Sequence, residues 1–345
     1  MNELLSYRRS QSFLSLHQDS VTAISVSRDG RYLASSGADS QLVIFVRSQN
    51  SFDYEVKRRL RARSAVLCLV WCEPGRLVAG TQNGEILAIL VSDAERSEDT
   101  KVKIEGFTAH DRPVEFLAYN STPNAPFKLA SCGRDVVRLW SWDRFDSPWA
   151  SVDLIELESA SAEKPAIITS LNVATSRRAT SCLFVTYFHH GIICYEWPVR
   201  NPAPRRVYWK LPILNCASCS VSPDTTFVVI YQPSRGFICQ RLDGGDPDVL
   251  STPEDSPPIY LPSAVAHGGL MIVTGSNDGK VKLWDYDVRP GTRMQTLQAQ
   301  DNSVIQAITT YYSIEDRQNL FIFLGTGRHG SENHVEIWRT TPQRA

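Results

Sequence analysis

LASCGRDVVRLW, residues 129–140, is the stretch of sequence that decides the fold. It contains a short apolar strand, a turn of small and polar residues that ends on Asp135, and a second strand, Val136 to Trp140, that closes on an aromatic residue. Strands of period two on either side of such a turn are typical of a β-hairpin. The segment therefore predicts one hairpin that closes on an aromatic residue.

The same pattern occurs at two other places in the chain. Residues 33–39, LASSGAD, precede the strand Gln41 to Phe45, and residues 273–279, VTGSNDG, precede the strand Lys280 to Trp284. Asp285 then completes a Trp-Asp pair. Repeats of about 40 to 45 residues that each hold such hairpins are typical of propeller blades.

These hairpins resemble the WD-repeat family, and the resemblance extends over nearly the whole chain. In that family a His before the repeat, a Ser or Thr in the second strand, the turn Asp and the closing Trp form a buried hydrogen-bonded tetrad. The tetrad residues that the resemblance implies are His17, Ser35 and Asp39 in the first repeat, His110, Ser131, Asp135 and Trp140 in the third, and Thr274, Asp278 and Trp284 in the sixth. Phe45 replaces the Trp of the first repeat, and the sixth has no His at the expected place.

One residue near the end of the third strand marks each repeat, including the degenerate ones. The markers are Phe45, Ile89, Trp140, Trp197, Arg241, Trp284 and Trp338. They are separated by 44, 51, 57, 44, 43 and 54 residues, which we interpret as one blade each, the longer steps carrying inserted loops. We therefore predict an all-β, seven-bladed WD-repeat β-propeller that occupies residues 1–345 as one domain.

The two ends of the chain predict closure of the ring. The chain stops soon after Trp338, which leaves the seventh blade without an outer strand, while Gln11 to Leu16 reads as a strand with no blade of its own. We expect this segment to complete the seventh blade, so that no sheet edge is left open there. The segments Phe145 to Ala166, Pro198 to Pro212 and Asp243 to Pro262 read as surface loops.

Composition limits the classes of function. The net charge of -1 argues against nucleic acid, because duplex binding needs a basic face. Met1 to Ser10 contains no signal-like apolar run, and no stretch approaches the roughly 18 apolar residues of a membrane span. We expect a cytoplasmic or nuclear protein that contacts no membrane. The eight cysteines are thinly spread, and we interpret the CxxC at Cys216 and Cys219 as two small core residues.

No motif predicts catalysis, a metal or a cofactor. Nucleophile-elbow, P-loop and HExxH motifs do not occur, and the adjacent His189 and His190 would point to opposite sides of a strand. Residues 325–330 match GxGxxG, but a strand rather than a helix is expected after them, so they predict a hairpin turn. We expect a protein that is not an enzyme.

Residues 57–63, KRRLRAR, hold five basic side chains in seven positions. Such a run is found in nuclear-import signals and phosphate-binding patches. It is also typical of a charged, solvent-facing outer strand followed by a loop. Both interpretations remain open at this point.

The resemblance implies a scaffold or adaptor that binds other proteins on the top face of the propeller. By the family's geometry, this face is built from residues just after the His position and just before the turn Asp. The implied contact residues are Asp19, Ser20, Arg63, Arg112, Arg134, His189, Asn277, Asn302 and Ser303. The three arginines favour partners that carry acidic or phosphorylated segments.

Two alternatives are a substrate receptor of a cullin-type ubiquitin ligase and a propeller enzyme with its active site in the channel. The receptors share a Trp-Asp-x-Arg ending, but Asp287 stands where the Arg belongs after Trp284, and Trp142-Asp143-Arg144 is out of frame. An enzyme would need carboxylates or histidines converging on the channel.

The tetrads also imply an uneven distribution of stability. If Asp135 belongs to a buried network, its replacement by alanine should cost about 2 to 4 kcal/mol. The same change at Asn83 should cost far less, because the second repeat lacks the His and the aromatic residue.

Overall fold

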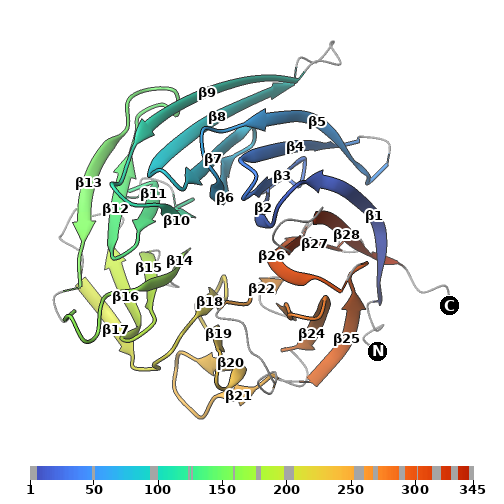
Figure 1. Cartoon of the computed structure of the whole chain (residues 1–345). Helices are drawn as coiled ribbons and strands as arrows, with labels where there is room; N and C mark the ends of the chain where they lie inside the picture. Colours follow the sequence, from blue (N-terminus) through green and yellow to red (C-terminus); the bar gives the residue numbers. More distant parts are fainter. Residues whose placement is uncertain are drawn as a thin grey trace.

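The residues that the structure describes form an all-β ring (Figure 1). This computed structural model describes residues 6–48, 51–93, 100–122, 125, 127–157, 160–175, 180–197, 206–251, 260–266, 271–286, 292–300, 302–312, 320–327 and 333–341. Within these ranges the strands form seven sheets of four strands each, and every sheet is one blade. The predicted seven-bladed β-propeller is confirmed.

In blades one to six the strands follow chain order from the centre of the ring outward (Figure 1). Blade one holds β2 (Val21–Val26), β3 (Tyr32–Gly37), β4 (Gln41–Arg47) and β5 (Tyr54–Arg61). Blade two holds β6 (Val66–Glu73), β7 (Arg76–Thr81), β8 (Glu85–Asp93) and β9 (Thr100–Thr108). Blade three holds β10 (Val114–Tyr119), β11 (Leu129–Gly133), β12 (Val136–Ser141) and β13 (Ala150–Ile155).

The remaining blades repeat this arrangement. Blade four holds β14 (Ile168–Thr175), β15 (Ser181–Tyr187), β16 (Gly191–Trp197) and β17 (Arg206–Leu211). Blade five holds β18 (Ser218–Val221), β19 (Phe227–Gln232), β20 (Gly236–Arg241) and β21 (Asp248–Val249). Blade six holds β22 (Ser263–Ala266), β23 (Met271–Thr274), β24 (Lys280–Asp285) and β25 (Thr292–Gln298). Blade seven holds β26 (Val304–Tyr312), β27 (Leu320–Gly327), β28 (Asn333–Thr341) and the N-terminal strand β1 (Ser6–His17).

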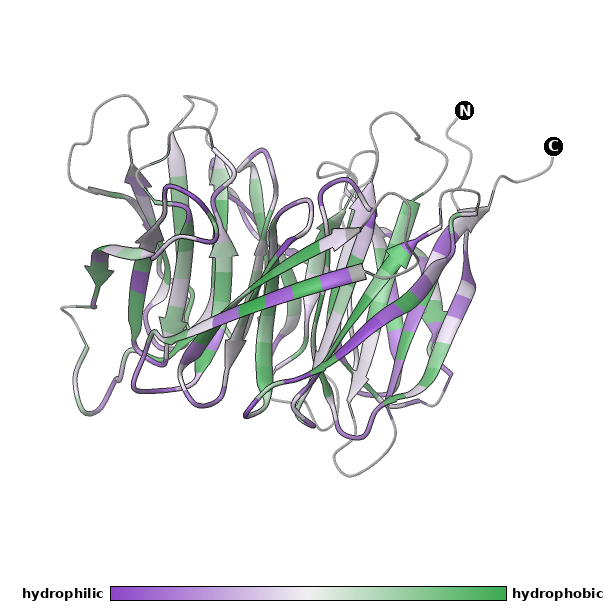
Figure 2. Ribbon diagram, turned by 90° about the horizontal axis from the view of Figure 1, so that it is seen from above, coloured by the Kyte–Doolittle hydropathy of each residue, from purple (hydrophilic) through white to green (hydrophobic). Residues whose placement is uncertain are grey.

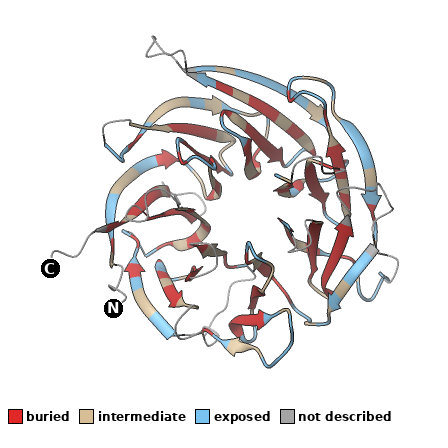
Figure 3. Ribbon diagram, turned by 180° about the vertical axis from the view of Figure 1, so that it is seen from behind, coloured by how far each residue is buried: buried red, intermediate tan, exposed pale blue. Residues whose placement is uncertain are grey.

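The hydrophobic core lies between blades. Each pair of neighbouring blades shares one buried cluster, as where Tyr54 of blade one packs against Phe321 and Phe323 of blade seven. A middle strand packs against a neighbouring blade on both of its faces, so β3 and β15 are buried at every position. Figure 2 shows the apolar strands running between the two faces of the ring, and Figure 3 shows exposure concentrated on the outer strands.

The N-terminal strand closes the ring, as predicted. β1 pairs antiparallel with β28 and aligns Tyr7 with Thr340 and Phe13 with Val335. The strand is longer than the predicted Gln11 to Leu16. Because the first and last parts of the chain share one sheet, the outermost strand of blade seven is supplied by the N-terminal segment.

The prediction of surface loops between the blades was partly wrong. The three segments contain the outer strands β13, β17 and β21 of blades three, four and five. Outer strands pack on one side only and mix exposed and half-buried side chains, as β13 does, so they lack the apolar pattern of the inner strands. The basic run of residues 57–63 falls mostly on such a strand, β5.

The seven marker residues all lie in third strands, but not all of them are in register. In blades one, three and six the pairing with the outer strand shifts immediately before Phe45, Trp140 and Trp284. In blade four the same shift precedes Tyr195 rather than Trp197. Tyr195 therefore occupies the position of the closing aromatic residue in that blade.

Candidate functional site

The topology gathers two kinds of connection on one face of the ring. We use "top face" for the turns between the second and third strands of the blades and the connections from each outer strand to the next blade. In an antiparallel meander these connections fall at the same strand ends. Backbone hydrogen bonds join these connections. The Ile168 N–H donates to the Arg134 carbonyl at 3.2 Å. The Phe188 N–H donates to the Ile167 carbonyl at 2.8 Å, and the Asn215 N–H donates to the Phe188 carbonyl at 2.7 Å. The top face is therefore bonded from blade to blade.

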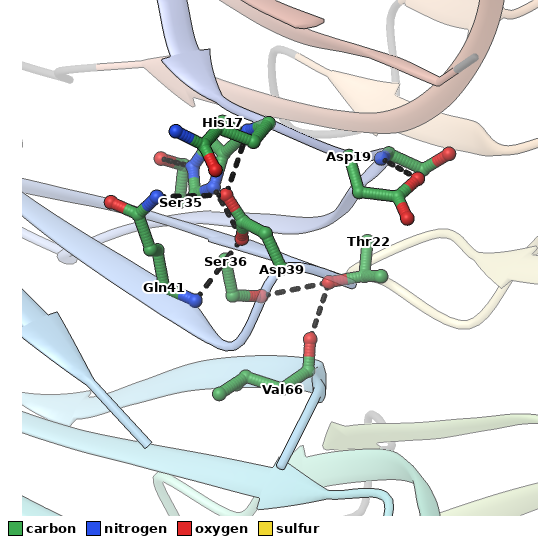
Figure 4. Close-up of polar contacts among 10 residues, drawn as sticks. His17, Asp19, Thr22, Ser35, Ser36, Asp39, Gln41 and Val66 are labelled. Atoms are coloured by element: carbon green, nitrogen blue, oxygen red, sulfur yellow. Dashed lines mark hydrogen bonds and ion pairs between the residues drawn. The ribbon is translucent and has the colours of Figure 1, made fainter. Parts of the chain in front are cut away.

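Blade one holds a hydrogen-bonded His–Ser–Asp set beneath this face (Figure 4). His17 Nδ1 lies 3.2 Å from Asp39 Oδ1, and His17 Nε2 lies 2.9 Å from Ser35 Oγ. A carboxylate only accepts, so Nδ1 carries the proton and Nε2 accepts the hydroxyl proton of Ser35. Asp39 also accepts the backbone N–H groups of Gln18 at 2.8 Å and Gln41 at 3.1 Å. The set ties the β1–β2 connection to the β3–β4 turn.

Burial sets the charge state of the histidine in this set. The side chains of His17 and Asp39 are 0% and 7% exposed. Desolvation lowers the pKa of His17, although the neighbouring Asp39 opposes the shift. The neutral imidazole can therefore keep both of its hydrogen bonds near pH 7.

In blade three the structure brings together three of the four implied tetrad residues. Trp140 Nε1 donates to Ser131 Oγ at 2.8 Å, and Ser131 Oγ lies 2.7 Å from His110 Nε2. Burial, followed by the charge of Arg138, lowers the pKa of His110 to about 4. Asp135 is exposed, and no hydrogen bond to His110 is found for its carboxylate within the described residues. The prediction that Asp135 belongs to a buried network is therefore wrong. The chain turns through Arg134, at a φ of 62°, and Asp135 faces solvent.

Blade six keeps only one bond of the tetrad. Trp284 Nε1 donates to Thr274 Oγ1 at 3.0 Å, and both side chains are buried. The carboxylate of Asp278 instead accepts from Ser276 within the turn and pairs with Lys280, and its side chain is 47% exposed. Asp278 therefore shapes the turn and takes no part in a buried set with Thr274.

Blade seven contains a buried carboxylate that the sequence reasoning missed. Glu336 is 0% exposed and accepts from Trp338 Nε1 at 3.1 Å, from the backbone N–H of Gln300 at 2.8 Å and from Arg9 at 3.3 Å. In the strand register of blade seven, Leu324 pairs with Glu336. At the equivalent position of blade three, Ser131 pairs with Arg138. Blade seven therefore bonds its closing Trp to a glutamate instead of a hydroxyl. The signal was a lone charge in the otherwise apolar segment VEIW.

All of the implied contact residues lie on top-face connections. Asp19 and Ser20 follow β1, Arg63 follows β5, Arg112 follows β9, Arg134 lies between β11 and β12, His189 between β15 and β16, Asn277 between β23 and β24, and Asn302 and Ser303 follow β25. Several are engaged locally: Asp19 accepts the N–H of Ser20 at 2.7 Å, and Asn302 accepts from Gln298 at 2.7 Å.

The three arginines differ in their surroundings. Arg63 is 86% exposed and pairs with Glu85 at 3.5 Å. Arg112 and Arg134 are exposed and have no ion pair with any residue that the structure describes. They extend from the same end of blade three, since Val114 pairs with Gly133 in the β10–β11 register. The two cations of blade three are therefore the most available for an external anion.

The residues relevant to a metal site, to the Trp-Asp-x-Arg motif of ligase receptors and to a membrane span have the following surroundings. No group of three His, Cys, Asp or Glu side chains that could hold a metal ion occurs among the described residues. Tyr286 and Asp287 occupy the last two positions of the Trp-Asp-x-Arg motif that begins at Trp284. Tyr286 packs on Phe227 with ring centroids 3.8 Å apart, and Asp287 lies outside the described residues. Arg144, on the opposite face, pairs with Asp146 at 3.0 Å. None of the described segments is a helix with the length and apolarity needed to cross a membrane.

Comparison with known families identifies the repeat. The family model described as "WD domain, G-beta repeat" matches residues 8–45 and 263–285. These ranges cover β1 to β4 and β22 to β24, and the first begins with the outer strand of the preceding blade. A comparison with curated proteins gives no match. The repeat match and the closed ring of seven four-stranded blades together support a WD-repeat β-propeller.

Proposed function

We propose that this protein is a non-catalytic scaffold or adaptor that binds acidic or phosphorylated segments of other proteins on its top face. WD-repeat propellers generally serve as protein-interaction platforms. The observation that carries the proposal is the pair of exposed arginines, Arg112 and Arg134, at one end of blade three, neither of which forms an ion pair with a described residue.

The chemistry of these side chains selects the class of partner. A guanidinium presents several N–H donors in one plane and binds carboxylate or phosphate through paired, charge-assisted bonds. The surroundings are mixed in sign, because Glu115 lies close to Arg134. Burial raises the pKa of Glu115, and the charge of Arg134 reduces that rise. The patch is thus local, and the bonds it makes weaken as salt increases.

A fixed face also reduces the entropy lost on binding. Backbone bonds join Arg134 to the connection that follows blade three, and the His110–Ser131–Trp140 set lies buried in the same blade. Loops that are already ordered lose less conformational entropy when a partner docks. This supports a platform that positions partners.

The proposed location is the cytoplasm or the nucleus. All eight cysteines are free thiols and buried, which is the usual state in reducing compartments.

The test is to replace both arginines of blade three. The double variant Arg112→Ala/Arg134→Ala is expected to lose at least one protein that copurifies with the wild-type chain, measured by affinity purification and quantitative mass spectrometry. Its thermal unfolding should match that of the wild type, because both side chains are exposed and make no ion pair among the described residues.

A matched control removes the same charge from the opposite face. Arg28, in the β2–β3 turn, and Arg144, in the β12–β13 connection, are both exposed. The variant Arg28→Ala/Arg144→Ala should keep every partner. If the blade-three variant also keeps every partner, the proposed binding face is wrong.

A further inference from the structure

A groove with a volume of about 260 Å³ lies between the outer parts of blades one and two. Leu42 and Leu60 of blade one form one side. Leu87, Ile89 and Ile104 of blade two form the other. The groove is therefore lined mainly by branched apolar side chains, although it opens on the outer surface of the ring.

One wall of this groove exposes an unusual amount of apolar surface. Ile104 on β9 is 45% exposed, while its neighbours Lys103 and Glu105 pair with each other at 2.8 Å. Gly106, which also lines the groove, has no side chain, and a Cβ there would lie too close to Leu87, at 2.8 Å from Leu87 Cδ2. At Gly106 the wall of the groove is therefore formed by backbone and by the Leu87 side chain, next to an exposed isoleucine.

The rim of the groove has an excess of positive charge. Arg61, Arg63 and Glu85 are the charged residues that line it. Glu85 pairs with Arg63, so the formal charge of Arg61 is not balanced within the lining. Just outside it, Lys57 pairs with Glu55 at 2.8 Å, so this pair adds no net charge to the rim. An occupant that complements this groove carries both apolar and acidic side chains.

We propose that this groove binds a partner segment in which a large apolar residue stands next to carboxylates. The apolar residue covers Ile104 and lies against Leu87 and Gly106, while the carboxylates meet Arg61 and Arg63. Arg63 belongs to the top face as well, so a segment in the groove continues onto that face. This inference rests on the proposed protein-binding function, but it concerns a surface separate from Arg112 and Arg134.

The test is a selection of random linear peptides displayed on phage against the intact wild-type protein. We expect enriched peptides to combine a Leu, Ile, Phe or Trp with neighbouring Asp or Glu. Their affinity should fall about tenfold or more in Ile104→Asp, which removes apolar contact and adds a repelling charge. Gly106→Leu, which fills the groove, should have the same effect and serves if Ile104→Asp fails to fold.

A matched control is available on blade three. Val152 lies on the outer strand β13 and is 47% exposed, close to the exposure of Ile104. Val152→Asp should leave peptide binding unchanged. The inference is overturned if no peptide is enriched, or if the enriched peptides bind wild type, Ile104→Asp and Gly106→Leu equally. The proposed function would survive that result if Arg112→Ala/Arg134→Ala still loses its partner.

Discussion

Replacing Glu336 with alanine should lower the free energy of unfolding by about 3 to 5 kcal/mol, because it removes two hydrogen bonds to a charged group that contribute about 1.5 to 3 kcal/mol each. The carboxylate is fully buried and accepts from Trp338, the Gln300 backbone and Arg9. Without it, the buried indole N–H of Trp338 and the backbone N–H of Gln300 both lose their acceptor; an unsatisfied buried donor costs about 1 to 3 kcal/mol. The link between β1 and β28 is weakened at the same time. Urea unfolding followed by tryptophan fluorescence measures the change.

Two further variants make this prediction specific. Glu336→Gln keeps a carbonyl acceptor of the same shape and should recover part of the lost stability. Glu55→Ala removes an exposed carboxylate that pairs with Lys57 and should cost less than about 1 kcal/mol. Equal urea midpoints for Glu336→Ala and Glu55→Ala would contradict the description of Glu336 as a buried link.

Asp39→Ala should be the second large effect, at about 2 to 4 kcal/mol, because it leaves a buried hydrogen-bond network half satisfied. Its carboxylate bonds to His17, to the backbone of Gln18 and to Gln41, and its side chain is 7% exposed. Asp135→Ala, at the matching position of blade three, should cost less than about 0.5 kcal/mol because Asp135 is exposed.

This order reverses the expectation from the sequence, in which Asp135 belonged to the most complete tetrad. Urea midpoints of the two variants, compared at equal m-values, provide the measurement. A larger loss in Asp135→Ala than in Asp39→Ala would show that the carboxylates of blades one and three have been assigned the wrong environments.

The ring could be predicted because its signals are local. A short strand, a small-residue turn and a strand that ends on an aromatic residue recur at a blade-sized interval, and the unpaired N-terminal strand matches the missing strand of the last blade. The outer strands β13, β17 and β21 were not predicted, since they pack on one side only and their sequences lack the inner pattern.

The hydrogen-bonded sets could be predicted only in part, because a motif gives residue types and not their exposure. Asp39 and Asp135 occupy the same motif position, yet one is buried against His17 and the other faces solvent. Glu336 was missed because a glutamate in a blade strand has no place in the motif. The top-face positions followed from topology, whereas the pairing of Arg63 with Glu85 depends on contacts between neighbouring connections.

The most direct test of the central proposal is amide hydrogen exchange of the protein, free and in complex with the partner recovered by purification. We predict slower exchange on binding at residues 109–113 and 133–136, the top-face connections that carry Arg112 and Arg134. Exchange at residues 27–31 and 142–149, on the opposite face, should not change. Protection confined to the opposite face, with no change around the two arginines, would contradict the proposal.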